Sequence, residues 1–337
     1  MDPEQLTGMS PKDLEMMGKT PEKTTTSEQE NFRKYETEAG GVELKYKEFA
    51  PVKTKSESDE VILYLPGAAL DPDSKSVQAL TQEYANYSNT RAFSVTTRID
   101  NPDVSDSQFP QSDAVRKFII ENKLRAITVV GNSQGGVKAV DLVYLLQKEN
   151  PDIKVNGLVL IGSGGLYEQD PKKLLQNFFK DATVDTPKNL IKTGLTKPRE
   201  SFIGPAVQVG SDVTAGIVKE AWRAPRELLK RMKLEAADAA RRNHRAEEIE
   251  APVVIVSGTL DSVFDHKEII PPDAEDQSLL SQQKRGEELK SKLFRKTKDI
   301  KVVTAQKAGH HGVQYFRPEA LAKTTLYLLD RMKRKEK

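Results

Sequence analysis

Residues 126–137 of the 337-residue chain read Ala-Ile-Thr-Val-Val-Gly-Asn-Ser-Gln-Gly-Gly-Val, and this stretch decides how the rest of the sequence is interpreted. Its first five residues predict a short buried strand, and the apolar residues of 137–146 recur at helical spacing. Ser133 therefore lies at a sharp turn from a strand into a helix, between Gly131 and Gly135. Glycines let the two backbones approach closely, and the helix N-terminus directs backbone N–H groups to the same point. The stretch predicts an exposed hydroxyl where an oxyanion would be stabilised.

The composition of the chain excludes several functional classes. The chain has no cysteine, which excludes disulfides, thiolate metal sites and cysteine nucleophiles. Charged residues make up 30% of the chain and the formal net charge is +2, which indicates a soluble protein and gives no reason to expect a nucleic-acid partner. No apolar run approaches the roughly 18 residues of a membrane span, and the N-terminus has no signal-peptide pattern. We therefore expect a cytoplasmic protein without a transmembrane segment.

Strand-like and helix-like patterns alternate on both sides of the Ser133 turn. This alternation predicts an α/β fold with a mostly parallel sheet and helices on both faces. An N-terminal hairpin is expected at 32–49, and the helix at 71–87 is expected to begin at a cap formed by Asp71 or Asp73. Further buried strands are predicted at 61–65, 92–97, 155–161, 252–257 and 300–304, and further helices at 113–122 and after Pro318.

Two segments depart from this alternation and define the predicted domains. Residues 1–30 are polar and are expected to form a flexible tail. Residues 166–249 contain helical patterns and no strand-like run, so we expect a helical lid between the two core segments, 31–165 and 250–337. Such an insertion would cover the carboxyl ends of the strands, where ligands bind in open α/β sheets. Its apolar side chains include Phe178, Phe179 and Trp222.

Candidate polar groups follow the last two predicted strands. Asp261 comes just after 252–257, where a carboxylate can hold an imidazole, although an Asp at this place can also cap a helix or form a turn. His310 and His311 follow 300–304. A His pair can be half of a metal site, but no third ligand clusters nearby in the sequence, so we expect no metal.

Two glycine-containing turns complete the set of motifs. Pro66-Gly67-Ala68 follows the strand at 61–65; it is either a plain turn or a loop that brings a second backbone N–H, that of Ala68, to Ser133. Gly162-Ser163-Gly164-Gly165 lacks the spacing of a dinucleotide motif and the lysine of a P-loop. We interpret it as a tight exit from the sheet and expect no cofactor.

In the order of these motifs, the chain resembles the α/β-hydrolase superfamily, and within it the branch of lidded serine esterases, lipases and peptidases. The order of serine, acid and histidine along the chain is the one typical of that superfamily. The resemblance covers roughly residues 42–332. The segments that carry it are Pro66-Gly67-Ala68, Gly131-Asn132-Ser133-Gln134-Gly135, Gly258-Thr259-Leu260-Asp261 and Gly309-His310-His311.

The resemblance implies a role for each of these residues. Ser133 would be the nucleophile, one of the two histidines would take its proton, and Asp261 would orient the imidazole. Backbone N–H groups of Ala68 and Gln134 would form the oxyanion hole. The interval between Asp261 and the histidines is longer than we expect in this family, which leaves Asp265 as an alternative acid.

The chain departs from the family pattern at two further points. Pro66 stands where many members have a histidine, which leaves the backbone donor of the loop in place. Family members usually have a glycine directly before the catalytic histidine, which favours His310. Many also have a proline seven residues after it, and Pro318 is seven residues after His311. The two patterns leave both histidines as candidates.

The activity that the resemblance implies is hydrolysis of a carboxylic ester, an acyl ester or a lipid-like molecule, through a Ser-His-Asp triad and an acyl-enzyme. No cofactor is implied. A lid of this kind also fits a peptidase or a thioesterase. A binding protein that kept the fold without turnover is the alternative from another functional class.

Overall fold

The computed structural model describes residues 6–7, 30–37, 40–52, 59–68, 70–99, 108–181, 225–259, 261–264, 279–305, 310 and 318–334. Most of the predicted tail and the part of the predicted lid between 182 and 224 lie outside these ranges. The same holds for some residues named above, among them the site candidates His311 and Asp265 and the expected lid residue Trp222.

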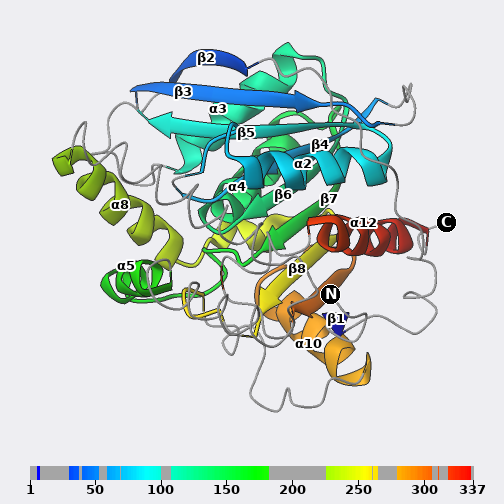
Figure 1. The fold of residues 1–337 in the computed structure, drawn as a ribbon. Coiled ribbons are helices and arrows are strands. Elements are labelled where there is room, and N and C mark those ends of the chain that lie inside the picture. Colours follow the sequence, from blue (N-terminus) through cyan, green and yellow to red (C-terminus); the bar gives the residue numbers. More distant parts are fainter. Residues whose placement is uncertain are drawn as a thin grey trace, which may run out of the picture.

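A nine-stranded sheet forms the centre of the molecule (Figure 1). All neighbouring pairs from β5 through β4, β6, β7 and β8 to β9 are parallel, whereas β3 is antiparallel to both β2 and β5. The predicted α/β fold with its mostly parallel sheet is confirmed, and so is the N-terminal hairpin. In spatial order the strands are β1 Leu6–Thr7, β9 Ile300–Ala305, β8 Val253–Gly258, β7 Lys154–Ile161, β6 Ala126–Asn132, β4 Glu60–Leu65, β5 Arg91–Ile99, β3 Gly40–Phe49 and β2 Glu30–Thr37.

Helices cover both faces of this sheet, as predicted. On β4 the side chains of Val61, Leu63 and Leu65 join one core cluster, and those of Ile62 and Tyr64 join the other. Both faces of the strand are therefore buried, which explains why its sequence is apolar without interruption. The first cluster includes side chains of α3 Gln108–Glu121, α4 Gln134–Glu149 and α10 Leu279–Lys292, and the second includes side chains of α2 Lys75–Ser88 and α12 Pro318–Arg334. None of the helices in the described ranges is both long and apolar enough to cross a membrane.

Three helical elements of the 166–249 segment are described. They are α5 Pro171–Lys180, α8 Pro225–Ala240 and the short 3-10 helix η3 His244–Glu248. Helices α5 and α8 lie together at one end of the sheet (Figure 1). A third apolar cluster joins them to α4 and to the loop after β8, through side chains that include Leu174, Ala239, Val137 and Phe264.

The cap predicted for the helix at 71–87 is wrong. Helix α2 begins at Lys75, and Ser74 occupies its N-cap position. Asp71 and Asp73 lie upstream in the loop after β4, where their carboxylates face lysines of β3: Lys45 lies 3.6 Å from Asp71, and Lys47 lies 3.6 Å from Asp73. These two acids attach the loop to β3 instead of capping the helix.

The structure adds one strand that the sequence analysis did not predict. Leu6 and Thr7, within the polar N-terminal segment, pair antiparallel with Ala305 and Thr304 of β9. This short strand covers the free edge of β9, the strand that precedes His310.

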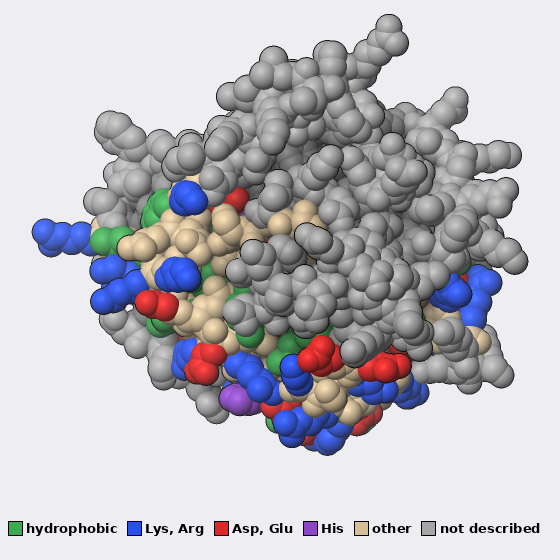
Figure 2. Space-filling view, turned by 90° about the horizontal axis from the view of Figure 1, so that it is seen from below, with side chains coloured by type: hydrophobic (Ala, Val, Ile, Leu, Met, Phe, Trp, Pro, Cys, Tyr) green, Lys and Arg blue, Asp and Glu red, His purple; other side chains and the backbone are tan. Residues whose placement is uncertain are grey.

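Charged side chains of both signs mix over the described part of the face in Figure 2. Among the described residues, ion pairs connect η3 to its surroundings: Glu248 lies 3.3 Å from Lys148 and 2.8 Å from Lys296. Exposed pairs of this kind add little stability, so the apolar clusters hold the fold together.

The turn between β6 and α4 requires an unusual backbone and very close packing. Ser133 has φ 51° and ψ −122°, a conformation that costs energy for any residue with a Cβ. Gly135 lies so close to the end of β4 that an added Cβ would stand 2.1 Å from the carbonyl oxygen of Leu65. An added Cβ on Gly131 would stand 2.6 Å from the Cβ of Ala139. Both motif glycines are therefore required by packing.

We expect Gly135→Ala to lower the free energy of unfolding by about 2–4 kcal/mol, because the new methyl group meets backbone atoms that cannot rotate away. Urea denaturation would show this as a lower midpoint at an unchanged m value. Gly286→Ala in α10 is the matched control: its added Cβ would stand 3.1 Å from the Ile300 carbonyl oxygen, a mild crowding that the higher helix propensity of alanine opposes, so we expect a change within about 1 kcal/mol. A Gly135→Ala protein as stable as the control would contradict this account of the turn.

Candidate active site

Three polar side chains from distant parts of the sequence meet at one end of the sheet. Ser133 follows β6, Asp261 follows β8 and His310 follows β9. The distance from Ser133 Oγ to His310 Nε2 is 3.0 Å, and the distance from His310 Nδ1 to Asp261 Oδ2 is also 3.0 Å. Both are hydrogen-bond distances, so the three side chains form one continuous chain of hydrogen bonds. Of the predicted site residues, the structure brings these three together; His311 and Asp265 lie outside the described residues.

All three side chains are shielded from water. Ser133 is 7% exposed, Asp261 is 4% exposed and the imidazole of His310 is fully buried. The second carboxylate oxygen of Asp261 accepts hydrogen bonds of 2.9 Å from the backbone N–H groups of both Val263 and Phe264. These bonds fix the carboxylate, so its Oδ2 remains directed at the imidazole.

The protonation of His310 is governed by its buried surroundings. Burial by itself lowers the pKa of this imidazole, but the negative charge and hydrogen bond of Asp261 oppose that effect. The buried carboxylate of Asp181, just after α5, acts in the same direction as Asp261. The net result is a His310 pKa raised above its ordinary value, so the imidazole is a stronger base than a free histidine.

Glycines outside the five-residue motif also allow close packing around the three polar side chains. The sequence did not predict this role for them. An added Cβ on Gly67 would stand 2.9 Å from the Ser133 Cβ, and one on Gly136 would stand 1.8 Å from the Ser163 Oγ. Gly162 has φ 47° and lies against the Asp261–His310 pair, where an added Cβ would be 3.2 Å from Asp261 Oδ2. The glycine cluster after β7, predicted as a tight exit from the sheet, thus lies directly behind the polar side chains.

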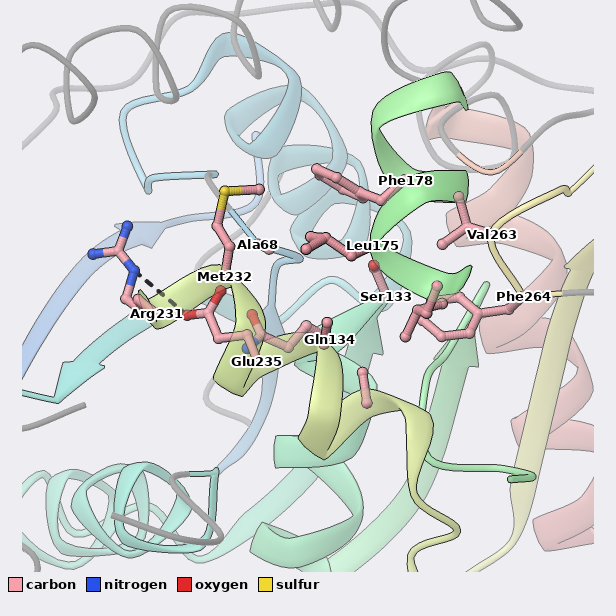
Figure 3. A pocket seen from close by; sticks show the side chains of 13 residues that line it. Ala68, Ser133, Gln134, Leu175, Phe178, Arg231, Met232, Glu235, Val263 and Phe264 are labelled. Atoms are coloured by element: carbon pink, nitrogen blue, oxygen red, sulfur yellow. Dashed lines mark ion pairs between the residues drawn. The ribbon is translucent and has the colours of Figure 1, made fainter. Parts of the chain in front are cut away.

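Ser133 lies in the wall of a pocket (Figure 3). Ala68 and Gln134, whose backbone N–H groups are the predicted oxyanion donors, line the pocket beside it. Phe178, an expected lid residue, lines it as well, whereas Phe179 is 38% exposed. Two of the other lining side chains are charged, those of Arg231 and Glu235. The remaining lining residues are apolar: Leu174, Leu175, Met232, Ala236, Ala239, Val263 and Phe264.

A buried lysine lies one helical turn beyond Gln134. Lys138 is 8% exposed, and its Nζ donates a hydrogen bond of 3.2 Å to Thr97 Oγ1. Burial lowers the pKa of this ammonium to about 8, although the carboxylate of Glu235 raises it in part. The sequence analysis missed Lys138 because a lysine on an amphipathic helix is normally solvated.

No metal ligand set is found in the described ranges, where no three His, Asp or Glu side chains converge closely enough to hold an ion.

Comparisons with known proteins place this fold among solved structures. No protein-family model and no curated protein matches the chain. The chain is similar to a candidate lipase from Acinetobacter baumannii, with 18% identity and a TM-score of 0.56 over 90% of this chain and 93% of that one. It is similar to a membrane phospholipase A, with 18% identity and a TM-score of 0.56 over 90% and 87% of the two chains. It is also similar to a serine hydrolase involved in carbazole degradation, with 20% identity and a TM-score of 0.55 over 90% and 99%.

The strand order, the helices on both faces and these similarities define the fold. The chain has the α/β-hydrolase fold, as the resemblance in its sequence implied. At identities of 18–20% the similarity establishes the fold and leaves the chemistry to be argued from the site.

We expect Lys138→Met to stabilise the protein by up to about 3 kcal/mol below pH 8, because the substitution removes a desolvated charge and keeps the apolar stem. In the wild type, the unfolded chain binds the Lys138 proton more strongly than the folded one. Its stability therefore rises as the pH increases from about 8, the pKa in the folded protein, towards the ordinary lysine value. The advantage of the variant should shrink over the same interval.

Urea denaturation at a series of pH values measures both effects. Lys148 is an exposed lysine on the same helix, so Lys148→Met is the control. It should change the free energy of unfolding by no more than about 0.5 kcal/mol. A destabilised Lys138→Met protein would contradict the assignment of an unfavourable buried charge.

Proposed function

We propose that this protein is a serine hydrolase that cleaves a carboxylic ester through an acyl-enzyme intermediate. The observation that carries the proposal is the continuous hydrogen-bonded chain Ser133–His310–Asp261, of which Ser133 lies in the wall of a pocket. An isolated serine hydroxyl is a weak nucleophile, and an adjacent base held by a third group is the arrangement that activates it.

In the first half-reaction, His310 Nε2 takes the hydroxyl proton while Ser133 Oγ attacks the ester carbonyl carbon. The negative charge that develops on the carbonyl oxygen would be stabilised by the backbone N–H groups of Ala68 and Gln134. The tetrahedral intermediate then collapses: the bond to the leaving alcohol breaks, and His310 gives that alcohol its proton. The products of this step are the free alcohol and an acyl group bound to Ser133.

In the second half-reaction, water attacks the acyl carbon while His310 takes a proton from it. Collapse of this second tetrahedral intermediate breaks the bond to Ser133 Oγ, which recovers its proton from His310, and the carboxylic acid leaves. Asp261 stabilises the imidazolium in both halves and holds the tautomer in which Nε2 faces the serine.

The pocket supports an ester as the substrate. Its apolar walls suit an acyl or alkyl group, and a lipase and a phospholipase are among the structures that share the fold. Peptides and thioesters react through the same acyl transfer, so assays on both would detect the related activities. A binding protein of this fold would show no turnover on any of them.

We expect Ser133→Ala and His310→Ala each to lower kcat on p-nitrophenyl esters by about 10³-fold or more, since each change removes a group that acts directly on the reacting atoms. His311→Ala is a matched control, because it is the same substitution one residue further on. It should retain the activity of the wild type. Equal activity in the His310 and His311 variants would remove His310 from the mechanism, and a fully active Ser133→Ala protein would overturn the proposal.

We expect kcat/KM of the wild type to fall as the pH decreases through the raised pKa of His310, because the imidazole must be neutral to accept a proton. Asp261→Asn removes the negative charge that raises this pKa. The variant should lose about 10⁴-fold in kcat, and its acid limb should move to lower pH. Profiles of kcat/KM against pH for the two proteins measure the shift. An acid limb at the same pH in both would contradict the coupling of Asp261 to His310.

A further inference from the structure

Helices α5 and α8 each turn one face towards the pocket. Leu175 and Phe178 of α5 and Met232 of α8 line it (Figure 3). The two helices lie together at one end of the sheet (Figure 1), so their other faces form the outside of the molecule beside the pocket. The proposed mechanism uses none of the residues on these outer faces.

The exposed residues of each helix follow one stripe along it. On α8 the exposed residues whose side chains are described stand at i, i+3, i+4 and i+7, the spacing of one helix face, whereas the pocket residues of α8 lie on the opposite side. On α5 the exposed residues after Pro171 share one face in the same way. We call the two stripes together the α5–α8 surface. Its described members are Lys172, Lys173, Gln176, Phe179 and Lys180 on α5 and Arg226, Leu229, Lys230 and Lys233 on α8.

Two bulky apolar side chains stand on the α5–α8 surface. Phe179 is 38% exposed and Leu229 is 48% exposed. The described part of the chain exposes only two other large apolar side chains to a similar extent, Phe32 on β2 and Ile120 on α3. Half of this set therefore lies on two neighbouring helices beside the pocket.

Cations surround these two apolar side chains. Helix α5 contains three lysines and no acidic residue, and the stripe of α8 adds Arg226, Lys230 and Lys233. The Arg231–Glu235 ion pair of α8 belongs to the pocket side, and no described carboxylate pairs with Arg226 or Lys233. The α5–α8 surface is thus cationic, although the net charge of the whole chain is only +2.

We propose that the α5–α8 surface docks the protein on anionic lipid bilayers. In the docked state, Phe179 and Leu229 enter the boundary between headgroups and acyl chains, and the lysines and Arg226 lie against the lipid phosphates. Binding to a membrane surface combines these two contributions, buried apolar area and attraction to anionic lipids. The aliphatic stems of the lysines can lie in the apolar layer while their charges stay at the headgroups. The inference goes beyond the proposed hydrolysis, since docking requires no turnover.

The mixture of side chains favours a bilayer over other polyanions. A nucleic acid would engage the cations through its phosphates but would give Leu229 no apolar environment. An acidic protein would need pockets of matching shape for both apolar side chains. A bilayer is fluid, so it accepts apolar side chains at any spacing among the cations.

Docking in this way brings the pocket close to the lipid. The rings of Phe179 and Phe178 pack edge to face, with 6.1 Å between their centroids, and Phe178 lines the pocket. One layer of side chains therefore separates the docking surface from the pocket wall.

Sedimentation with lipid vesicles tests the inference on the full chain. We expect the wild type to bind vesicles of an equimolar mixture of phosphatidylglycerol and phosphatidylcholine at least about 10-fold more tightly than vesicles of phosphatidylcholine alone. The binding should weaken as the salt concentration increases, because salt screens exposed charges. A wild type that does not bind the anionic vesicles would overturn the inference. So would one that binds polyglutamate but not vesicles, which would indicate an acidic protein as the partner.

A first pair of variants tests the apolar contribution. Phe179→Ser should weaken binding to the anionic vesicles by about 10-fold, because the variant buries less apolar area in the bilayer. Phe32→Ser removes the same exposed side chain from β2, so it is the matched control and should bind like the wild type. Equal binding of the two variants would contradict insertion of Phe179.

A second pair tests the charges. The double variant Lys230→Gln/Lys233→Gln should weaken binding by about 20-fold, since each cation at an anionic surface contributes about fivefold in affinity. Lys292→Gln/Lys296→Gln removes the same charge at the end of α10 and just after it, and it should bind like the wild type. Near-ultraviolet circular dichroism verifies that each variant is folded. Equal binding of the two double variants would overturn the inference.

Sedimentation measures binding alone, so this inference and the proposed function fail separately. An active hydrolase that ignores the anionic vesicles would overturn docking and leave the proposed function in place. A protein that docks through the α5–α8 surface but hydrolyses no ester would support docking and contradict the proposed function.

Discussion

The strained turn at Ser133 is the constraint on which the rest of the structure depends. Its backbone lies in a region that residues with a Cβ rarely adopt, so the surrounding chain must hold it there. The Ser133 carbonyl accepts hydrogen bonds of 3.1 Å from the N–H groups of both Gly136 and Gly164, and its own N–H donates to the carbonyl of Ile161. Helix α4 and the end of β7 thus fix the turn from two sides, which directs the hydroxyl into the pocket.

The parallel sheet supplies the rest of the arrangement. Strands β6, β7, β8 and β9 run in the same direction, so the segments that follow them emerge at one edge. This is why Ser133, Asp261 and His310 meet although they are far apart in the sequence. The same edge carries α5 and α8, whose side chains line the pocket beside Ser133 with both apolar and charged groups. Position in the sheet thus determines which chemical groups meet beside the pocket.

The parts of the fold that could be predicted from sequence depend on local pattern. The uninterrupted apolar run of β4 predicts a buried strand. The glycine-flanked turn at Ser133 predicts a close approach of the strand and helix backbones. The order of Ser133, Asp261 and the histidine pair was enough to predict that these groups converge. The choice between His310 and His311 could not be made, because the flanking Gly309 and Pro318 favour different residues; the structure describes His310, and it lies at the hydrogen-bonding position.

The features that could not be predicted depend on contacts between distant segments. Nothing near Lys138 in the sequence distinguishes it from a solvated lysine, since its hydrogen-bond partner Thr97 lies on β5 and the carboxylate that acts on it, Glu235, lies on α8. Asp71 and Asp73 look like helix caps until β3 places Lys45 and Lys47 opposite them. Gly67 and Gly162 are required by side chains that approach from other strands. In each case the decisive neighbour lies too far along the chain for a local pattern to indicate it.

The central claim is that the surroundings of Ser133 make its hydroxyl nucleophilic, and labelling with a fluorophosphonate tests that claim most directly. Mass spectrometry of the treated, folded protein should find one adduct, on the peptide that contains Ser133. The adduct should be absent from Ser133→Ala and should form far more slowly in His310→Ala. A folded wild type that takes up no label, or a label that persists in Ser133→Ala, would contradict the account.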